Sequence, residues 1–214
     1  MMLKGDRRLW LAVGVAAVWW FYMFSPWTAG VTNFWFTMTA AALCLTAFAL
    51  SGTKASSILN AQCSILHCLR QLLLGVLIAA VLWGVFWLGD RISSVLFDFA
   101  RPQVDSIYGM KTGLPPWLIA VLLLLVIGPA EELFWRGYVQ RVLSARRGRD
   151  WAFVVTTAVY ALIHVWSFNF MLVMAALVCG LVWGLLYRFK PSWLPAIIVS
   201  HALWDACVFV VFPI

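Results

Sequence analysis

The chain has 214 residues, of which 64% are hydrophobic and only 11% are charged. Water-soluble globular domains carry roughly 25% charged residues, so this composition excludes that class and indicates an integral membrane protein. The formal net charge is +7. Its basic residues are spread over separate short segments, which excludes a nucleic-acid surface and favours loops that meet lipid headgroups.

Seven apolar runs follow one another along the chain, each close to the ~20 residues that cross a bilayer as a helix. They begin at Leu9, Phe34, Leu72, Trp117, Trp151, Phe170 and Leu194. We therefore expect an all-α, polytopic membrane helix bundle of about seven transmembrane helices, built as a single integral membrane domain over residues 1–214. The first run is long and aromatic and precedes a poor cleavage site, which favours a retained helix over a signal peptide.

Two segments between the runs are too polar to cross a membrane. The segment from Ala55 to Arg70 is expected to form a surface helix or loop. The segment from Asp90 to Pro116 mixes charges, apolar residues and prolines, as an interfacial or re-entrant linker would. Residues 1–115 are thus N-terminal spans and a linker, and no internal repeat is visible.

The placement of lysine and arginine predicts the orientation, because short cytoplasmic loops collect positive charge. With a cytoplasmic N-terminus, eleven basic residues lie in cytoplasmic segments, namely Lys4, Arg7, Arg8, Lys54, Arg70, Arg141, Arg146, Arg147, Arg149, Arg188 and Lys190. Only Arg91, Arg101 and Lys111 lie outside. We therefore expect an N-terminus in the cytoplasm and a C-terminus outside.

Other conspicuous residues have simpler interpretations. The five cysteines lack paired CxxC spacing, and the four-residue spacing of Cys63 and His67 would allow a metal site, although an apolar interfacial patch is favoured. The tryptophans Trp19, Trp20, Trp83, Trp117 and Trp151 are interpreted as interface anchors.

Six ionisable residues remain at membrane depth and have no loop to explain them. They are Glu131, Glu132, Arg136, His164, His201 and Asp205. A charged Asp, Lys or Arg inside a span costs roughly 2.5–3.5 kcal/mol on insertion scales, so such residues usually pair, face inward and serve a function. Because the six come from three different runs, we expect one shared polar site.

Helical spacing allows such a site. Glu132 and Arg136 are four residues apart and form a natural ion pair, while Glu131 lies about 100 degrees around the helix and points elsewhere. His201 and Asp205 share a face of the last run. Pro129 is expected to kink its helix, and a restart of the helix there would place both glutamates in a first turn, where the helix dipole favours negative charge.

This set of groups suits peptide-bond hydrolysis without a serine or cysteine nucleophile. A carboxylate beside an imidazole can remove a proton from water, and a second imidazole can stabilise the oxyanion that forms when the water attacks an amide.

The motifs EELFWR (131–136), YALIH (160–164) and HALWD (201–205) resemble the EExxxR, FxxxH and HxxxN/D motifs of the CPBP family, the CAAX-protease and bacteriocin-processing (Abi) intramembrane proteases. The resemblance covers residues 116–214, which would be the catalytic core. It implies that Glu131 activates water with His164 assisting, that His201 and Asp205 hold the oxyanion side, and that Glu132 and Arg136 support the site.

Two residues depart from the family pattern. Tyr160 stands where the family often has phenylalanine, and its hydroxyl needs a partner. Asp205 stands where prenyl-protein processing members have asparagine, a better donor to an oxyanion than an ionised aspartate. Asp205 is therefore either protonated by burial or orients His201.

The second departure leaves metal dependence open. Glu131, His164 and His201 could hold zinc with an open water position, yet there is no HExxH motif and the glutamate mechanism needs no metal. No cofactor is favoured, with zinc as the alternative.

The expected function is an intramembrane endopeptidase of the cytoplasmic (inner) membrane, acting on a membrane-anchored protein or peptide in contact with the lipid bilayer and no nucleic acid. Two other classes compete. A non-catalytic membrane scaffold or immunity protein could keep the same fold, and a proton-coupled transporter would be expected to show repeated halves with interrupted helices.

Overall fold

The computed structural model describes residues 4–51 and 64–214, with side chains from Arg7 onward, and its secondary structure in these ranges is helical throughout. The α-helices are α1 (Lys4–Phe24), α2 (Phe34–Leu50), α4 (Ile65–Leu96), α5 (Ala100–Gly109), α6 (Pro116–Leu122), α7 (Gly128–Phe134), α8 (Arg141–Arg147), α9 (Arg149–Leu162), α10 (Phe170–Phe189) and α11 (Leu194–Ala206). Three π-helical segments, η1 (Leu123–Ile127), η2 (Trp135–Gln140) and η5 (Cys207–Val211), and two 3-10 segments, η3 (Ile163–Ser167) and η4 (Pro191–Trp193), join them.

All seven apolar runs fold as helices, which confirms an all-α membrane protein. Four helical stretches in the described part of the chain are long and apolar enough to cross a bilayer: Ile65–Leu96, Pro116–Arg147, Phe170–Phe189 and Pro191–Val211. Phe34–Leu50 is apolar but shorter, and the count of seven stays a prediction.

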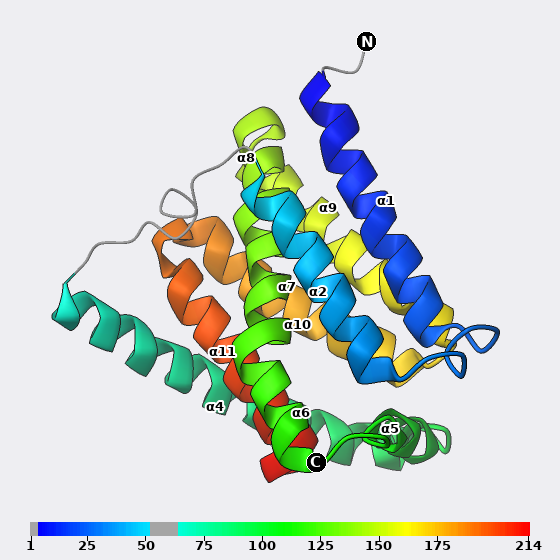
Figure 1. Cartoon of the computed structure of the whole chain (residues 1–214). Helices are drawn as coiled ribbons and strands as arrows, with labels where there is room; N and C mark the ends of the chain where they lie inside the picture. Colours follow the sequence, from blue (N-terminus) through cyan, green and yellow to red (C-terminus); the bar gives the residue numbers. More distant parts are fainter. Residues whose placement is uncertain (1–3, 52–63) are drawn as a thin grey trace.

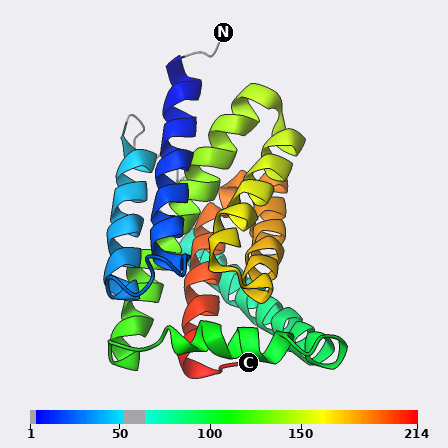
Figure 2. The same ribbon diagram turned by 90° about the vertical axis from the view of Figure 1, so that its right-hand side faces the viewer.

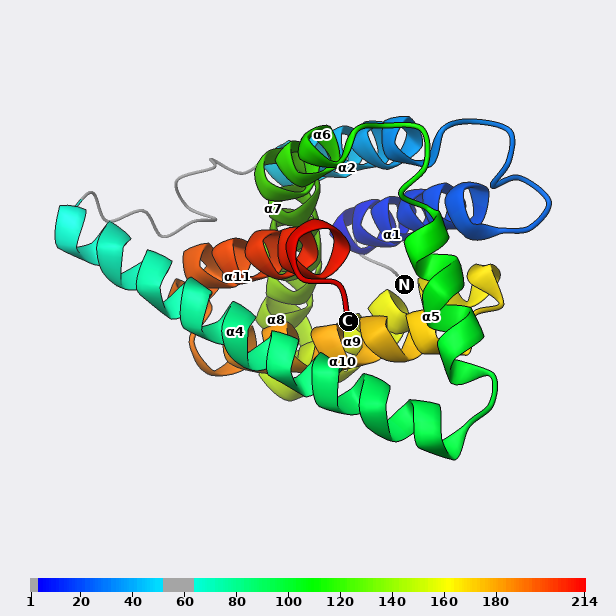
Figure 3. The same cartoon turned by 90° about the horizontal axis from the view of Figure 1, so that it is seen from below.

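The helices form an upright bundle around α11, crossed on one side by the oblique α4 (Figure 1). Viewed from below, α11 lies between α4 and the α6–α7 stretch (Figure 3), and it packs against both. The 90° view separates α1 and α2 on one side from α9 and α10 on the other (Figure 2). Five of the six ionisable residues lie on α7, η2 and α11. These elements are therefore central in the bundle.

Small residues allow the central helices to approach closely. A Cβ added at Gly128 would lie 2.8 Å from Cα of Ala202, and one at Gly75 would lie 2.6 Å from Cγ1 of Val199. These glycines therefore set the distances of α7 and α4 from α11.

The structure extends helix α4 into both polar linkers. Asp90 to Leu96 continues α4, and only then does the chain turn into the short helix α5. Ile65 to Arg70 forms the first turns of α4, while residues 52–63, including Cys63, lie outside the described residues. An oblique helix can exceed the ~20 residues of an upright span, which explains why the polar ends of α4 remain helical.

The expected helix restart at Pro129 is wrong. Residues Pro116–Arg147 run as one helical stretch, and the amide of Gly128 donates to the carbonyl of Leu123, five residues back. A widened π turn before the proline relieves its clash and its missing amide donor without a break. The glutamates therefore lie inside a continuous helix and gain no dipole of a free helix N-terminus.

Candidate active site

The structure brings the six predicted residues into the interior of the bundle. Glu131 and Glu132 lie on α7, Arg136 on η2, His164 on η3, and His201 and Asp205 on α11. Each residue is at most 9% exposed. Their burial confirms that the polar groups face inward from three separate stretches of the chain.

Glu132 joins two helices at the centre of this cluster. Its Oε1 accepts a hydrogen bond from the Arg136 guanidinium at 2.8 Å, the predicted ion pair, and another from Nδ1 of His201 at 2.7 Å. All three side chains are essentially buried, so water cannot screen the pair. Glu132 therefore ties α7 to α11 as well as to its own helix.

Arg136 is held from several sides. Its second terminal nitrogen donates to the Gly180 carbonyl at 3.4 Å, and its Cζ lies 4.9 Å from the ring centroid of Tyr160 and 5.7 Å from that of Trp183. Aromatic faces attract a guanidinium. Arg136 thus connects α9 and α10 to the carboxylate cluster.

His201 lies between two carboxylates and an indole. Its Nε2 is 3.4 Å from Oδ2 of Asp205, on the same face of α11 as predicted, and its Nδ1 faces Glu132. The Trp183 ring stacks on the imidazole with a centroid distance of 4.0 Å and an interplanar angle of 17°. Asp205 thus lies beside His201, and both interpretations of Asp205 stay predictions.

Glu131 has different partners from its neighbour Glu132. The Tyr160 hydroxyl donates to its Oε2 at 3.0 Å. In the described ranges no group hydrogen-bonds its other oxygen, Oε1. Glu131 is therefore a buried carboxylate at the cluster with one oxygen left to accept a proton.

His164 reaches this cluster through Tyr160. The two rings pack edge to face at a centroid distance of 5.4 Å. Nδ1 of His164 donates to the Tyr160 carbonyl at 2.8 Å, and Nε2 accepts from the indole N–H of Trp20 at 2.9 Å. Both ring nitrogens are therefore engaged, and neither bonds to Glu131.

The predicted zinc ligands do not fit a metal in this arrangement. Within residues 4–51 and 64–214, no group of three or more His, Cys, Asp or Glu side chains is placed to hold a metal ion. The lone pair of His164 is taken by Trp20, and both nitrogens of His201 face carboxylates. His67, the other metal candidate, lies beside Gln71 on α4.

The sequence interpretation missed the supporting residues Gln140, Trp183 and Ser200 and misassigned Trp20, whereas it named the Tyr160 hydroxyl as a group that needs a partner. Trp20, predicted as an interface anchor, is buried and bonds to His164. Gln140 donates to the Gly184 carbonyl at 2.8 Å, Trp183 donates to Ser200 at 3.1 Å, and Tyr160 meets Glu131. Gln140 lies four residues after Arg136, and this spacing is the signal that could have identified it.

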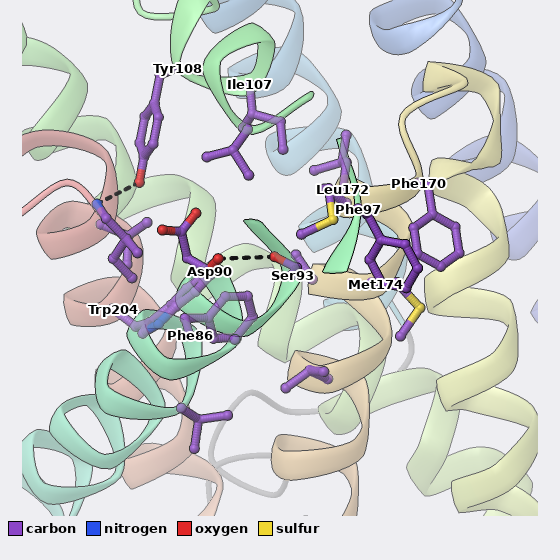
Figure 4. A pocket seen from close by; sticks show the side chains of 18 residues that line it. Phe86, Asp90, Ser93, Phe97, Ile107, Tyr108, Phe170, Leu172, Met174 and Trp204 are labelled. Carbon is purple, nitrogen blue, oxygen red and sulfur yellow. Dashed lines mark hydrogen bonds between the residues drawn. The ribbon is translucent and has the colours of Figure 1, made fainter. Parts of the chain in front are cut away.

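An apolar pocket of about 350 Å³ lies beside the cluster, between α4, α5, α10 and α11. Phe86, Ile107, Leu172 and Met174 line it (Figure 4). Trp204 connects it with the cluster, because Trp204 lines the pocket and its ring lies 6.1 Å from that of Trp183.

The polar groups of this pocket each have a partner. The Ser93 hydroxyl donates to the Asp90 carbonyl, and the Tyr108 hydroxyl accepts from the amide of Ile214 (Figure 4). The Asp90 carboxylate pairs with Arg101. Burial raises the pKa of Tyr108 on α5, so the hydroxyl stays neutral. The pocket therefore presents an apolar surface to an occupant.

Fold and cluster together define an all-helical membrane protein with a buried carboxylate–imidazole site. Residues 113–207 match the family model described as type II CAAX prenyl endopeptidase Rce1-like. The matched segment contains all six site residues, which confirms the resemblance to the CAAX-protease (CPBP) family in this part of the chain. Searches of curated proteins and of solved structures give no match.

Proposed function

We propose that the protein is an intramembrane endopeptidase in which Glu131 activates a water molecule. The observation that carries the proposal is the asymmetry of the glutamate pair. Glu132 is bound by Arg136 and His201, whereas Glu131 is oriented by Tyr160 and keeps one oxygen without a partner among the described residues. A carboxylate that is oriented but not neutralised by a direct cation suits a general base.

The reaction follows from these positions. Oε1 of Glu131 takes a proton from water while the water oxygen forms a bond to the carbonyl carbon of the substrate peptide. The carbonyl becomes a tetrahedral oxyanion. The same proton then passes from Glu131 to the departing amine as the C–N bond breaks, which leaves a carboxylic acid and an amine.

His201 is the proposed donor to the oxyanion. Its Nε2 lies 3.4 Å from Asp205, a long distance for a charge-assisted hydrogen bond. This N–H is therefore available to a developing negative charge, while the short bond from Nδ1 to Glu132 and the stacked Trp183 hold the ring in one orientation. Preorganised donors of this kind are a large source of rate enhancement.

The proposed substrate is a membrane-associated protein or peptide. The family description supports this class, and the pocket beside Trp204 offers an apolar surface for the part of the substrate next to the cleaved bond. We further propose that the chain resides in a prokaryotic inner membrane with a cytoplasmic N-terminus, because the basic residues concentrate on that side.

The test compares protein termini by mass spectrometry in membranes of host cells that make the natural chain or Glu131→Gln at equal abundance. We expect termini that appear only with the natural chain, and their sequences identify the substrate. Chelator treatment then tests the zinc-dependent alternative. Identical termini from two folded proteins would reject the protease and favour a non-catalytic scaffold or immunity protein.

A further inference from the structure

Trp20 contacts the site from a part of the chain that carries none of the motifs. It lies on α1, outside the matched segment 113–207. Trp20 is 1% exposed and His164 7%, and their side chains meet across 144 residues of sequence at 2.9 Å. An indole has a donor and no acceptor, so the bond has only one possible direction: from Nε1–H of Trp20 to Nε2 of His164.

The second ring nitrogen confirms this assignment independently. Nδ1 of His164 lies 2.8 Å from the Tyr160 carbonyl oxygen, and a carbonyl only accepts. The proton of a neutral imidazole must then reside on Nδ1, which leaves Nε2 as the acceptor. Two separate contacts, from α1 and from α9, therefore require the same tautomer of His164.

Aromatic packing holds α1 in the position that makes this contact. Trp20 and Phe24 pack on the His164 ring with centroid distances of 5.8 and 5.7 Å, and Phe21 packs on Trp166 at 5.0 Å. Thus one face of α1 covers η3. Breaking the contact would leave a buried indole N–H and a buried imidazole nitrogen without partners, which is costly at membrane depth.

We propose that Trp20 is a positioning residue of this site, which fixes the tautomer and orientation of His164 from α1. The site then comprises α1 together with the motif-bearing helices. The catalytic consequence rests on the proposed protease function, whereas the tautomer itself does not. His164 in this state is a neutral ring with an occupied lone pair, so it supports the site through Tyr160 and is not itself the base.

The test is a comparison of Trp20→Phe, which removes the indole N–H and keeps an aromatic ring, with Trp19→Phe on the same helix. Protein labelled with ¹⁵N-histidine has only three histidines, and His164→Gln assigns the His164 signals. We expect the Nε2 signal to move downfield in Trp20→Phe and to stay unchanged in Trp19→Phe. An unchanged Nε2 signal in Trp20→Phe overturns the proposal.

A second experiment counts the Glu131-dependent protein termini that each enzyme molecule forms in the same two variants. We expect Trp20→Phe to form roughly tenfold fewer, a smaller loss than the roughly 10²–10⁴-fold contribution of a general base, because His164 stays in place. An altered Nε2 signal with unchanged cleavage would show that the contact is merely structural, and this outcome also overturns the proposal.

Two further outcomes, a Trp20→Phe variant that does not fold and a natural chain that does not cleave, can be distinguished from each other. If Trp20→Phe does not fold, a scalar coupling between Nε1 of Trp20 and Nε2 of His164 in the natural chain decides the contact, and its absence overturns the proposal. If the natural chain forms no Glu131-dependent termini, the proposed protease function fails and the positioning role fails with it, while the ring signals still report whether Trp20 sets the tautomer.

Discussion

Glu131 and Glu132 are adjacent in the chain, but their partners differ in kind. Glu132 accepts from the guanidinium of Arg136 on η2 and from the imidazole of His201 on α11, and Glu131 receives one neutral hydroxyl. One carboxylate therefore supports the structure, and the proposed chemistry belongs to the other.

This difference predicts opposite effects of two matched substitutions. Glu132→Gln leaves the buried charge of Arg136 without its counterion and should destabilise the fold by roughly 3 kcal/mol. Glu131→Gln should abolish cleavage and leave the unfolding temperature nearly unchanged or higher, because it removes an unpaired buried charge. Thermal unfolding in detergent and the terminus assay measure the two effects. Equal destabilisation by both substitutions would contradict the assignment of a structural role to Glu132 and a chemical role to Glu131.

Tyr160 connects Glu131, Arg136 and His164 through its hydroxyl, its ring and its carbonyl. Tyr160→Phe removes only the hydroxyl, and a hydrogen bond to a charged group contributes about 1.5–3 kcal/mol. We therefore expect cleavage to fall by roughly 10-fold to 100-fold with the fold intact. Tyr187→Phe, at another buried tyrosine, is the control and should have no effect on cleavage. Undiminished cleavage by Tyr160→Phe would show that the hydroxyl does not orient Glu131.

At the scale of elements, the contact of α7 with α11 determines the distance between Glu132 and His201. A methyl group at Gly128 would lie 2.8 Å from the backbone of Ala202, next to His201, and backbone cannot move aside as a flexible side chain can. Gly128→Ala should therefore separate the helices, lower stability by about 1–3 kcal/mol and reduce cleavage. Gly84→Ala on α4 has open space around it and is expected to preserve both. Thermal unfolding and the terminus assay compare the two variants, and equal behaviour would refute the role of this contact.

Helical periodicity explains which contacts the sequence could predict. Glu132 with Arg136, and His201 with Asp205, follow from four-residue spacing on a helix. The bonds from Glu132 to His201 and from Trp20 to His164 join residues 69 and 144 positions apart. Such contacts depend on how the helices pack. The π turn before Pro129 was equally hidden, because a proline in a sequence does not specify whether its helix breaks or widens.

At the scale of the whole molecule, the pocket between α4, α5, α10 and α11 is the apolar space beside the site. Ala175 lines it from α10. Ala175→Phe should fill part of the pocket and raise the substrate concentration needed for cleavage, without loss of thermal stability. Leu181 is exposed on the same helix, so Leu181→Phe is the matched control. Initial cleavage rates at several substrate expression levels measure the effect, and equal rates for both variants would show that substrate does not use the pocket.

The bundle also has two ends that the charge distribution distinguishes. The turn from α8 to α9 lies at the end where α1 begins, and the loop from α1 to α2 lies at the opposite end (Figure 1). The first end carries the arginine-rich segment 141–149, and positive loops stay in the cytoplasm.

We therefore expect Arg147→Cys to react with a membrane-impermeant maleimide only after the cells are permeabilised, and Gly30→Cys to react in intact cells. Both positions are exposed, and Gly30 has open space around it. The background replaces the five native cysteines with alanine. The reverse labelling pattern would show that the protein has the opposite orientation in the membrane. It would place the α1–α2 loop and the nearby segment η3, which carries His164, toward the cytoplasm, and substrate would then approach His164 from the cytoplasmic side.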